Sequence, residues 1–151
     1  IEFKAGPKIR SVLGERGHIN VTSYNRMVLI TGEVPADADR ATVEQAVASI
    51  ENVRSTVNET AVMGAASLTA RSNDSIISGK VKAALVDDGE IQATAIKVVT
   101  ERAVVYLMGR VTEREAAKAA QVASAVSGVS KVVRVFETIT EAELQAWQAK
   151  H

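Results

Sequence analysis

Few residues in this chain have the types and spacing that catalysis or metal binding requires. His18 and His151 are its two histidines, one expected in a loop between a helix and a strand and the other at the C-terminal end. An imidazole acts as a base or holds a metal ion only when a nucleophile, an orienting carboxylate or further ligands lie beside it. The sequence places no such group near either histidine, so a solvated loop residue is the simpler interpretation of His18.

Glu113 and Glu115 resemble a pair of carboxylates for acid–base chemistry, but they open an expected helix. Thr112 and Glu115 have the spacing of a capping box, and acidic side chains are favoured in the first turn of a helix. The chain has no cysteine, no phosphate-binding glycine loop and no ligand cluster with metal spacing. The sequence therefore predicts a protein that is not an enzyme, that has no cofactor or metal, and that acts by non-covalent binding.

The composition is typical of a folded protein with no long-range electrostatic preference. Hydrophobic residues make up 46% and charged residues 24% of the chain, outside the range of disordered proteins. Because 18 basic residues balance 18 acidic ones, no global field draws the protein to nucleic acid or to an anionic membrane. Nucleic acid is not an expected partner, and any attraction to anionic lipid has to come from a local patch.

Two halves of the chain repeat one pattern. The segment INVTSYNRMVLITGEV (19–34) aligns without gaps with IKVVTERAVVYLMGRV (96–111). Further on, ASIENVRSTV (48–57) aligns with SAVSGVSKVV (124–133) after a shift of one residue. Repetition over this length indicates a tandem duplication of one module.

The periodicity of the first copy predicts a helix, a hairpin, a second helix and a third strand. Residues 19–22 alternate, a polar turn follows at 23–26, and residues 27–34 form the second strand. The helix after this hairpin is expected to be capped by Asp37 or Asp39.

The second copy repeats this order. Its hairpin turn is expected at residues 100–102, and the third strands of the two copies are expected over 53–60 and 129–139. A helical crossover from the second to the third strand favours a parallel pairing. The predicted fold class is α+β, with two tandem α-β-β-α-β modules, each a three-stranded mixed sheet packed on two helices.

The predicted boundaries follow from these elements: a first module over 1–64, a linker over 65–72, a second module over 73–140 and a helical extension over 141–151. The chain starts with IEFK inside an expected helix, so a processed N-terminal segment with a targeting signal is expected before it. No apolar run approaches the roughly 20 residues that cross a bilayer.

Gly32 and Gly109 occupy the same position of a strand in the two copies. A glycine within a strand marks a bulge or the close approach of another backbone. This structural interpretation is preferred over direct ligand contact, and a larger residue at either position is expected to distort its module.

Three stretches resemble the BON domain of bacterial envelope proteins: VLITGEV, NDSIISGKVKAALV and VYLMGRVTEREAAKAAQVASAVSGVSKVV. Over residues 8–140 the chain resembles the dual-BON-domain lipoproteins of the Gram-negative outer membrane. The resemblance implies a periplasmic protein held at the outer membrane by an N-terminal lipid, with a role in envelope integrity and cell division. It also implies binding of anionic phospholipids, such as phosphatidylglycerol and cardiolipin, by the first helix of the second module.

That helix is expected over about residues 75–86, where Ile77, Val81 and Leu85 are spaced by four and should face the sheet. Position 76 is where a family member with described lipid contacts has tryptophan. Asn73, Asp74 and Ser75 are expected to cap it, and phosphate binds well at a helix start. Packing against the core or the first module is the alternative role of Ile76. The residues assigned to lipid contact are Asn73, Ser75, Ile76, Gly79, Lys80 and Ala83.

A second function remains open, that of an adaptor which docks envelope or division components. The modules or the C-terminal extension would make this contact, and the extension has Leu144 and Trp147 on one side. Three roles are open to Trp147: packing on a module, entry into a membrane interface, or contact with a partner chain. The oligomeric state does not follow from the sequence.

Overall fold

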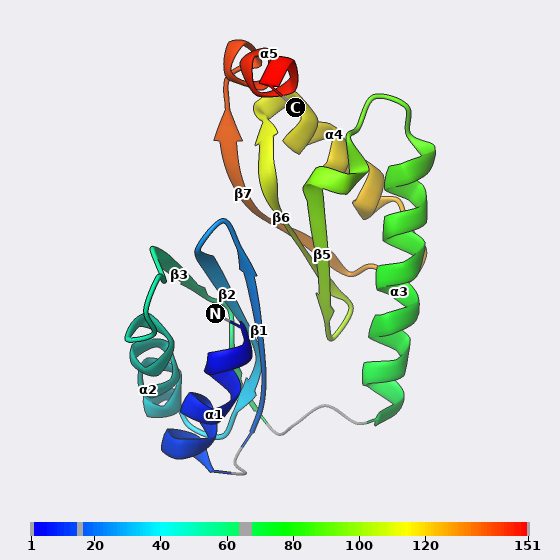
Figure 1. The fold of residues 1–151 in the computed structure, drawn as a ribbon. Coiled ribbons are helices and arrows are strands. Elements are labelled where there is room, and N and C mark those ends of the chain that lie inside the picture. The colour runs from blue at the N-terminus through cyan, green and yellow to red at the C-terminus, as the bar shows by residue number, and fades with distance from the viewer. Residues whose placement is uncertain (1, 15–16, 64–67, 151) are drawn as a thin grey trace. The chain divides into compact units, whose positions relative to one another are not determined.

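The computed structural model describes residues 2–14, 17–63 and 68–150, and the chain divides into two compact units, Ile1–Leu68 and Thr69–His151. Each unit contains one copy of the repeat with its elements in the predicted order (Figure 1). The α+β class and the tandem duplication are therefore confirmed.

The first module is a mixed sheet with two helices on one face. In its sheet, β1 and β2 are antiparallel, and β3 and β4 both run parallel to β2. Side chains of α1 and α2 share one buried cluster with Val28, Ile30 and Val34 of β2, and Figure 1 shows both helices on the same side of the sheet. The elements are α1 (Glu2–Leu13), β1 (His18–Tyr24), β2 (Met27–Val34), α2 (Asp37–Ala48), β3 (Ser55–Asn58) and β4 (Ala61–Val62).

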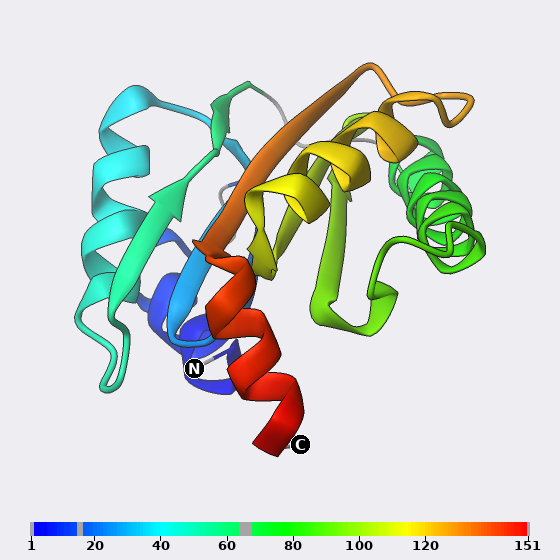
Figure 2. The ribbon, with the colours of Figure 1, turned by 90° about the horizontal axis from the view of Figure 1, so that it is seen from above.

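The second module has the same plan. The strand β6 is central, antiparallel to β5 and parallel to β7. Side chains of α3 and α4 share a buried cluster with Val98, Val105 and Leu107, and Figure 2 shows both helices on one side of the sheet. The elements are α3 (Leu68–Asp87), the 3-10 turn η1 (Ala93–Ala95), β5 (Ile96–Glu101), β6 (Val104–Thr112), α4 (Glu113–Ser124), β7 (Lys131–Ile139) and α5 (Glu141–Lys150).

Both hairpins close with two residues of positive φ. These are Asn25 (49°) and Arg26 (67°) in the first module, and Arg102 (50°) and Ala103 (62°) in the second. Positive φ at both central residues is typical of the tight turn whose twist matches the two strands. The turn predicted at residues 100–102 was therefore placed too early, since β5 continues through Glu101.

The third strand differs between the modules. The strand predicted over 53–60 is interrupted, because the Asn58 side chain bends the backbone between β3 and β4. Its Oδ1 accepts hydrogen bonds from the backbone N–H of Thr60 at 3.1 Å and from the Thr60 hydroxyl at 2.6 Å. The corresponding β7 pairs continuously with β6.

The helices after the two hairpins begin differently. The N-cap of α2 is Ala36, which makes no side-chain cap, so the prediction that Asp37 or Asp39 caps this helix was wrong. Both acids lie in its first turn, where the helix dipole favours negative charge. The capping box of α4 is confirmed, because Thr112 Oγ1 accepts from the Glu115 N–H at 3.2 Å and Glu115 Oε1 accepts from the Thr112 N–H at 3.3 Å.

Gly32 and Gly109 lie where the backbone of the neighbouring strand approaches closely. Their φ values are 115° and 152°, in a region that side chains other than glycine rarely enter. A Cβ at Gly32 would collide with the carbonyl oxygen of His18, and a Cβ at Gly109 would collide with that of Ala95. Glycine at this position thus avoids a steric clash with the backbone in both hairpins.

Candidate functional site

The outward face of α3 contains the residues that the sequence assigned to lipid contact. The helix has 20 residues, and Ile77, Val81 and Leu85 bury its other face at 2%, 0% and 1% exposure. This spacing by four residues puts the side chains that lie between them on the solvent side. Exposed on that side are Asn73, Ser75, Ile76, Gly79, Lys80 and Ala83.

The observed start of α3 shows that the phosphate site predicted at the N-terminus of this helix was misplaced. The helix begins at Leu68 instead of near Ser75, so much of the predicted linker is helical, while residues 65–67 lie outside the described part. Asn73 and Ser75 are therefore interior residues and not caps, and the Ser75 hydroxyl donates to the carbonyl oxygen of Arg71 at 3.3 Å. The free N–H groups of a helix belong to its first turn, so Ile76 does not lie beside them.

Asp74 has a different role from the predicted cap. Its side chain is buried at 6% exposure, and its two oxygens accept hydrogen bonds from the hairpin turn between β5 and β6. The N–H of Arg102 donates to Oδ2 at 2.9 Å, and the N–H of Ala103 donates to Oδ1 at 2.8 Å. One turn further along α3, the hydroxyls of Ser78 and Thr100 lie 2.7 Å apart. These contacts hold the helix against the hairpin, which determines which face of α3 points outward.

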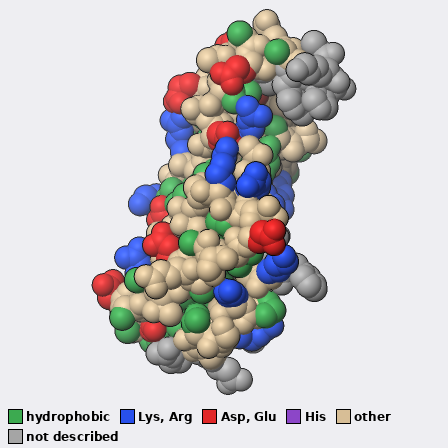
Figure 3. All heavy atoms as spheres, turned by 60° about the vertical axis from the view of Figure 1, so that its left-hand side comes forward, with side chains coloured by type: hydrophobic (Ala, Val, Ile, Leu, Met, Phe, Trp, Pro, Cys, Tyr) green, Lys and Arg blue, Asp and Glu red, His purple; other side chains and the backbone are tan. Residues whose placement is uncertain are grey.

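The outward face combines apolar and basic side chains. Ile76 is 57% exposed and Val86 is 72% exposed, both high values for large aliphatic residues. Lys80 lies one turn after Ile76, is exposed, and makes no ion pair with a described residue. On the part of the surface that Figure 3 shows, basic and acidic side chains are interspersed, in agreement with the balanced charge of the chain.

Gly79 leaves a gap on the same face. It lies inside the helix, and a Cβ added there would meet nothing within 4 Å. Glycine lowers helix stability by about 1 kcal/mol relative to alanine, and no backbone strain or close neighbour requires it here. This position therefore accepts larger side chains.

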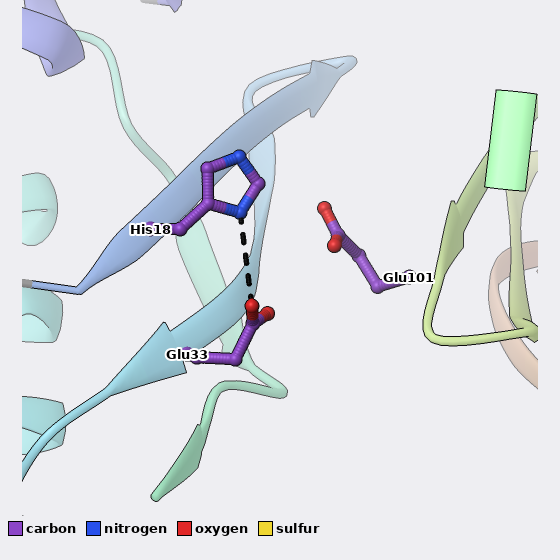
Figure 4. A group of neighbouring side chains, drawn as sticks. All are labelled: His18, Glu33 and Glu101. Atoms are coloured by element: carbon purple, nitrogen blue, oxygen red, sulfur yellow. Dashed lines mark ion pairs between the residues drawn. The ribbon is translucent and has the colours of Figure 1, made fainter. Parts of the chain in front are cut away.

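Each candidate for catalysis lies beside another side chain of the fold. His18 is the first residue of β1, not a loop residue, and its Nδ1 lies 4.0 Å from Glu33 Oε1 (Figure 4). Glu113 forms an ion pair with Arg134 at 2.6 Å, while Glu115 belongs to the capping box. The two carboxylates at the start of α4 thus serve the fold.

The extension after the second module forms α5. The N–H of Glu143 donates to Thr140 Oγ1 at 3.0 Å, which caps the helix, and Arg114 pairs with Glu141 at 3.1 Å. The side chains of Leu144 and Trp147 lie outside the described residues. Among the helices of the described ranges, none has both the length and the hydropathy of a membrane span.

Comparison with known proteins assigns residues 7–64 and 73–140 to the BON domain. The chain is 35% identical over 139 residues to the outer membrane lipoprotein DolP of Haemophilus influenzae, a match that covers 91% of this chain and 72% of that protein. It is 34% identical over 127 residues to a 21 kDa hemolysin of Actinobacillus pleuropneumoniae, covering 84% of this chain and 66% of the relative.

A further relative matches a shorter stretch. The osmotically-inducible protein Y of Escherichia coli is 48% identical over 61 residues, which cover 40% of this chain and 30% of that protein. The Haemophilus relative is named as a lipoprotein of the outer membrane, which is part of the bacterial envelope. This chain belongs to the BON-domain family and is a DolP-like, dual-BON protein of the bacterial envelope.

Proposed function

We propose that this protein binds anionic phospholipid, such as phosphatidylglycerol or cardiolipin, through the outward face of α3, and that it supports the integrity of the outer membrane. In this proposal the full-length protein is periplasmic and an N-terminal lipid holds it at the outer membrane. The observation that carries the proposal is the exposure of Ile76 one helical turn from Lys80. The similarity to an outer membrane lipoprotein supports the same location.

The chemistry of this face suits the boundary between headgroups and acyl chains. Ile76 would enter the apolar region, where complete burial of such a side chain contributes about 1.5–3 kcal/mol. Lys80 would meet the phosphates, and a basic residue near an anionic surface contributes about 1 kcal/mol. The sum is a few kcal/mol, so binding through α3 alone is weak. A lipid tether would raise the local concentration of the protein and so make this weak contact effective.

The second module is the better candidate for this contact. Its first helix has 20 residues, which correspond to a length of about 30 Å, and Ile76 and Val86 are exposed on it. A helix of this length presents a long face to a membrane. The first module would then act mainly as support for the second in lipid binding.

Vesicle binding tests the proposal directly. Ile76→Glu is expected to weaken binding to phosphatidylglycerol or cardiolipin vesicles by about tenfold or more, since a carboxylate replaces the apolar contact and is repelled by the anionic surface. Flotation with vesicles of defined composition would measure the bound fraction, with phosphatidylcholine vesicles as the uncharged reference. Failure of the unmodified chain to bind anionic vesicles at low salt would refute the proposal.

The charge contribution has a matched control on the same helix. Lys80→Gln is expected to weaken binding about fivefold and to reduce its salt dependence. Lys82→Gln removes the same charge from another side of α3, because residues two apart do not share a helix face. Equal losses for the two variants would show that net charge, and not this face, governs binding.

Gly79→Leu is expected to strengthen vesicle binding by about tenfold. The added side chain extends into open space near Ile76 and offers more apolar surface to the acyl chains. It also replaces a poor helix former with a good one, so the melting temperature should rise. Flotation and a thermal melt of the same sample separate the two effects. A higher melting temperature with unchanged vesicle binding would place the lipid contact elsewhere.

The adaptor function is the alternative, and α5 is the observation that favours it. This helix lies outside both BON matches and is exposed at Glu141 and Glu143. Deletion of residues 141–151 distinguishes the functions. Loss of an envelope protein partner, in a chain that does not bind vesicles, would favour the adaptor, whereas unchanged vesicle binding would agree with the lipid proposal.

A further inference from the structure

A groove of about 280 Å³ lies between α1 and β1 of the first module. Its lining combines apolar side chains of α1 and β1 with Arg10, His18 and three glycines. This groove is separate from the outward face of α3, and the lipid proposal gives it no role. The apolar residues of the lining are Ile9, Leu13, Ile19 and Val21.

Gly6 keeps part of this groove open. It lies within α1, where glycine costs about 1 kcal/mol relative to alanine. Leaving aside its chain neighbours and the backbone of its own helix, a Cβ at this position would meet only the Arg10 guanidinium, at an ordinary contact distance of 3.7 Å. Pro7 follows directly within the helix, and a Cβ on the residue before a proline crowds the proline ring in the helical conformation, so glycine also suits this position for that reason. The absence of a side chain at Gly6 also leaves space in the groove.

Arg10 gives the groove a positive charge. Its side chain belongs to the lining, the residue is exposed, and it makes no ion pair or hydrogen bond with a described residue. A guanidinium is always charged at physiological pH, and its fork of N–H donors fits a carboxylate or a phosphate. The groove thus has apolar side chains beside the guanidinium of Arg10, which pairs with no described carboxylate.

We propose that this groove binds a single-chain anionic amphiphile, with the hydrocarbon chain along the apolar floor and the acidic group at Arg10. Pockets for small ligands typically have volumes of about 300–1,000 Å³, and this groove lies just below that range. Its size therefore suits one chain and not the two chains of a phospholipid. The ligand class differs from that proposed for α3, which would contact the surface of a bilayer.

Titration of the full chain with dodecanoate and with dodecyl phosphate, each below its micelle concentration, tests this site. Amide NMR shifts are expected to saturate at α1 and β1 with at least one of these anions. Tighter binding of dodecanoate would indicate a fatty acid, and tighter binding of dodecyl phosphate would indicate a lysophospholipid headgroup. Shifts that occur only above the micelle concentration, or only on α3, would overturn the proposal.

Three variants test which residues bind the acidic group of the ligand and which bind its hydrocarbon chain. Arg10→Gln is expected to weaken binding of the anions about tenfold, because it removes a charge-assisted contact, while binding of the uncharged dodecanol should change little. Lys8→Gln is the matched control, since it removes one charge from the same helix at a residue outside the groove lining. Equal losses for Arg10→Gln and Lys8→Gln would refute specific pairing at Arg10.

Gly6→Leu should fill the groove and abolish the shifts for all three ligands. Because a side chain on the residue before Pro7 is disfavoured in a helix, circular dichroism and a thermal melt have to show first that the module remains folded. Retention of binding by a folded Gly6→Leu chain would exclude the groove as the site.

Discussion

Gly32→Val is expected to unfold the first module, and Gly109→Val is expected to unfold the second. A β-branched side chain at a φ of 115° or 152° is strained by about 1–3 kcal/mol, and its Cβ would also collide with the carbonyl oxygen of His18 in β1 or of Ala95 directly before β5. To relieve that collision, the two strands of the hairpin would have to separate. Small domains have only about 3–5 kcal/mol of stability, so the combined cost is comparable with the whole free energy of unfolding.

Urea denaturation followed by circular dichroism would measure this loss, and amide NMR spectra would show which module has lost its dispersed signals. Gly79→Ala is the control, because this glycine lies in a helix with open space around it. It should stabilise the second module by about 0.5–1 kcal/mol. A loss below about 1 kcal/mol for both valine variants would show that the strands accommodate a side chain.

Asp74→Ala is expected to destabilise the second module by about 2–4 kcal/mol. The substitution leaves the N–H groups of Arg102 and Ala103 without their acceptor, and each unsatisfied, partly buried donor costs about 1–3 kcal/mol. Asp74→Asn should cost about half as much, because an amide offers one acceptor oxygen in place of two.

Urea denaturation of the two Asp74 variants and of Asp87→Ala would measure this effect. Asp87 lies on the same helix and is exposed, so its replacement should change stability by less than about 0.5 kcal/mol. Equal stabilities of the unmodified chain and of Asp74→Ala would show that the turn amides find water or another acceptor. The Asp74 variants act on folding, whereas Ile76→Glu should leave stability nearly unchanged and act on vesicle binding. The two adjacent positions thus separate the support of α3 from its proposed contact.

The sequence determined the features that depend on neighbouring residues. Alternation over residues 19–22 and the polar turn after them predicted the first hairpin, and the spacing of Ile77, Val81 and Leu85 predicted the buried face of α3. Each of these patterns repeats within a few residues and reflects the geometry of one strand or one helix. The capping box of Thr112 and Glu115 is equally local.

Internal repetition added information that one copy alone lacks. Gly32 and Gly109 recur at the same place in the two copies, which predicted a shared structural role, and the structure shows the close backbone approach at both. The sequence placed Ile76 and Lys80 on a flank beside the buried stripe but left open whether Ile76 packs in the core, and the structure shows both residues exposed. The duplicated pattern was therefore sufficient for the module, whereas the exposure of Ile76 required the structure.

Only the tertiary structure decided where α3 begins and what Asp74 does. The acceptors and donors that decide these points lie far apart in the chain, as the pairing of Asp74 with Arg102 and Ala103 shows. At the level of the sequence, an aspartate before an apolar stripe looks the same whether it caps a helix or bonds to a distant turn. The groove beside Gly6 and Arg10 likewise exists only because β1 packs against α1. Local spacing specifies which residues share a face, whereas the partner that each face meets depends on how the chain folds back on itself.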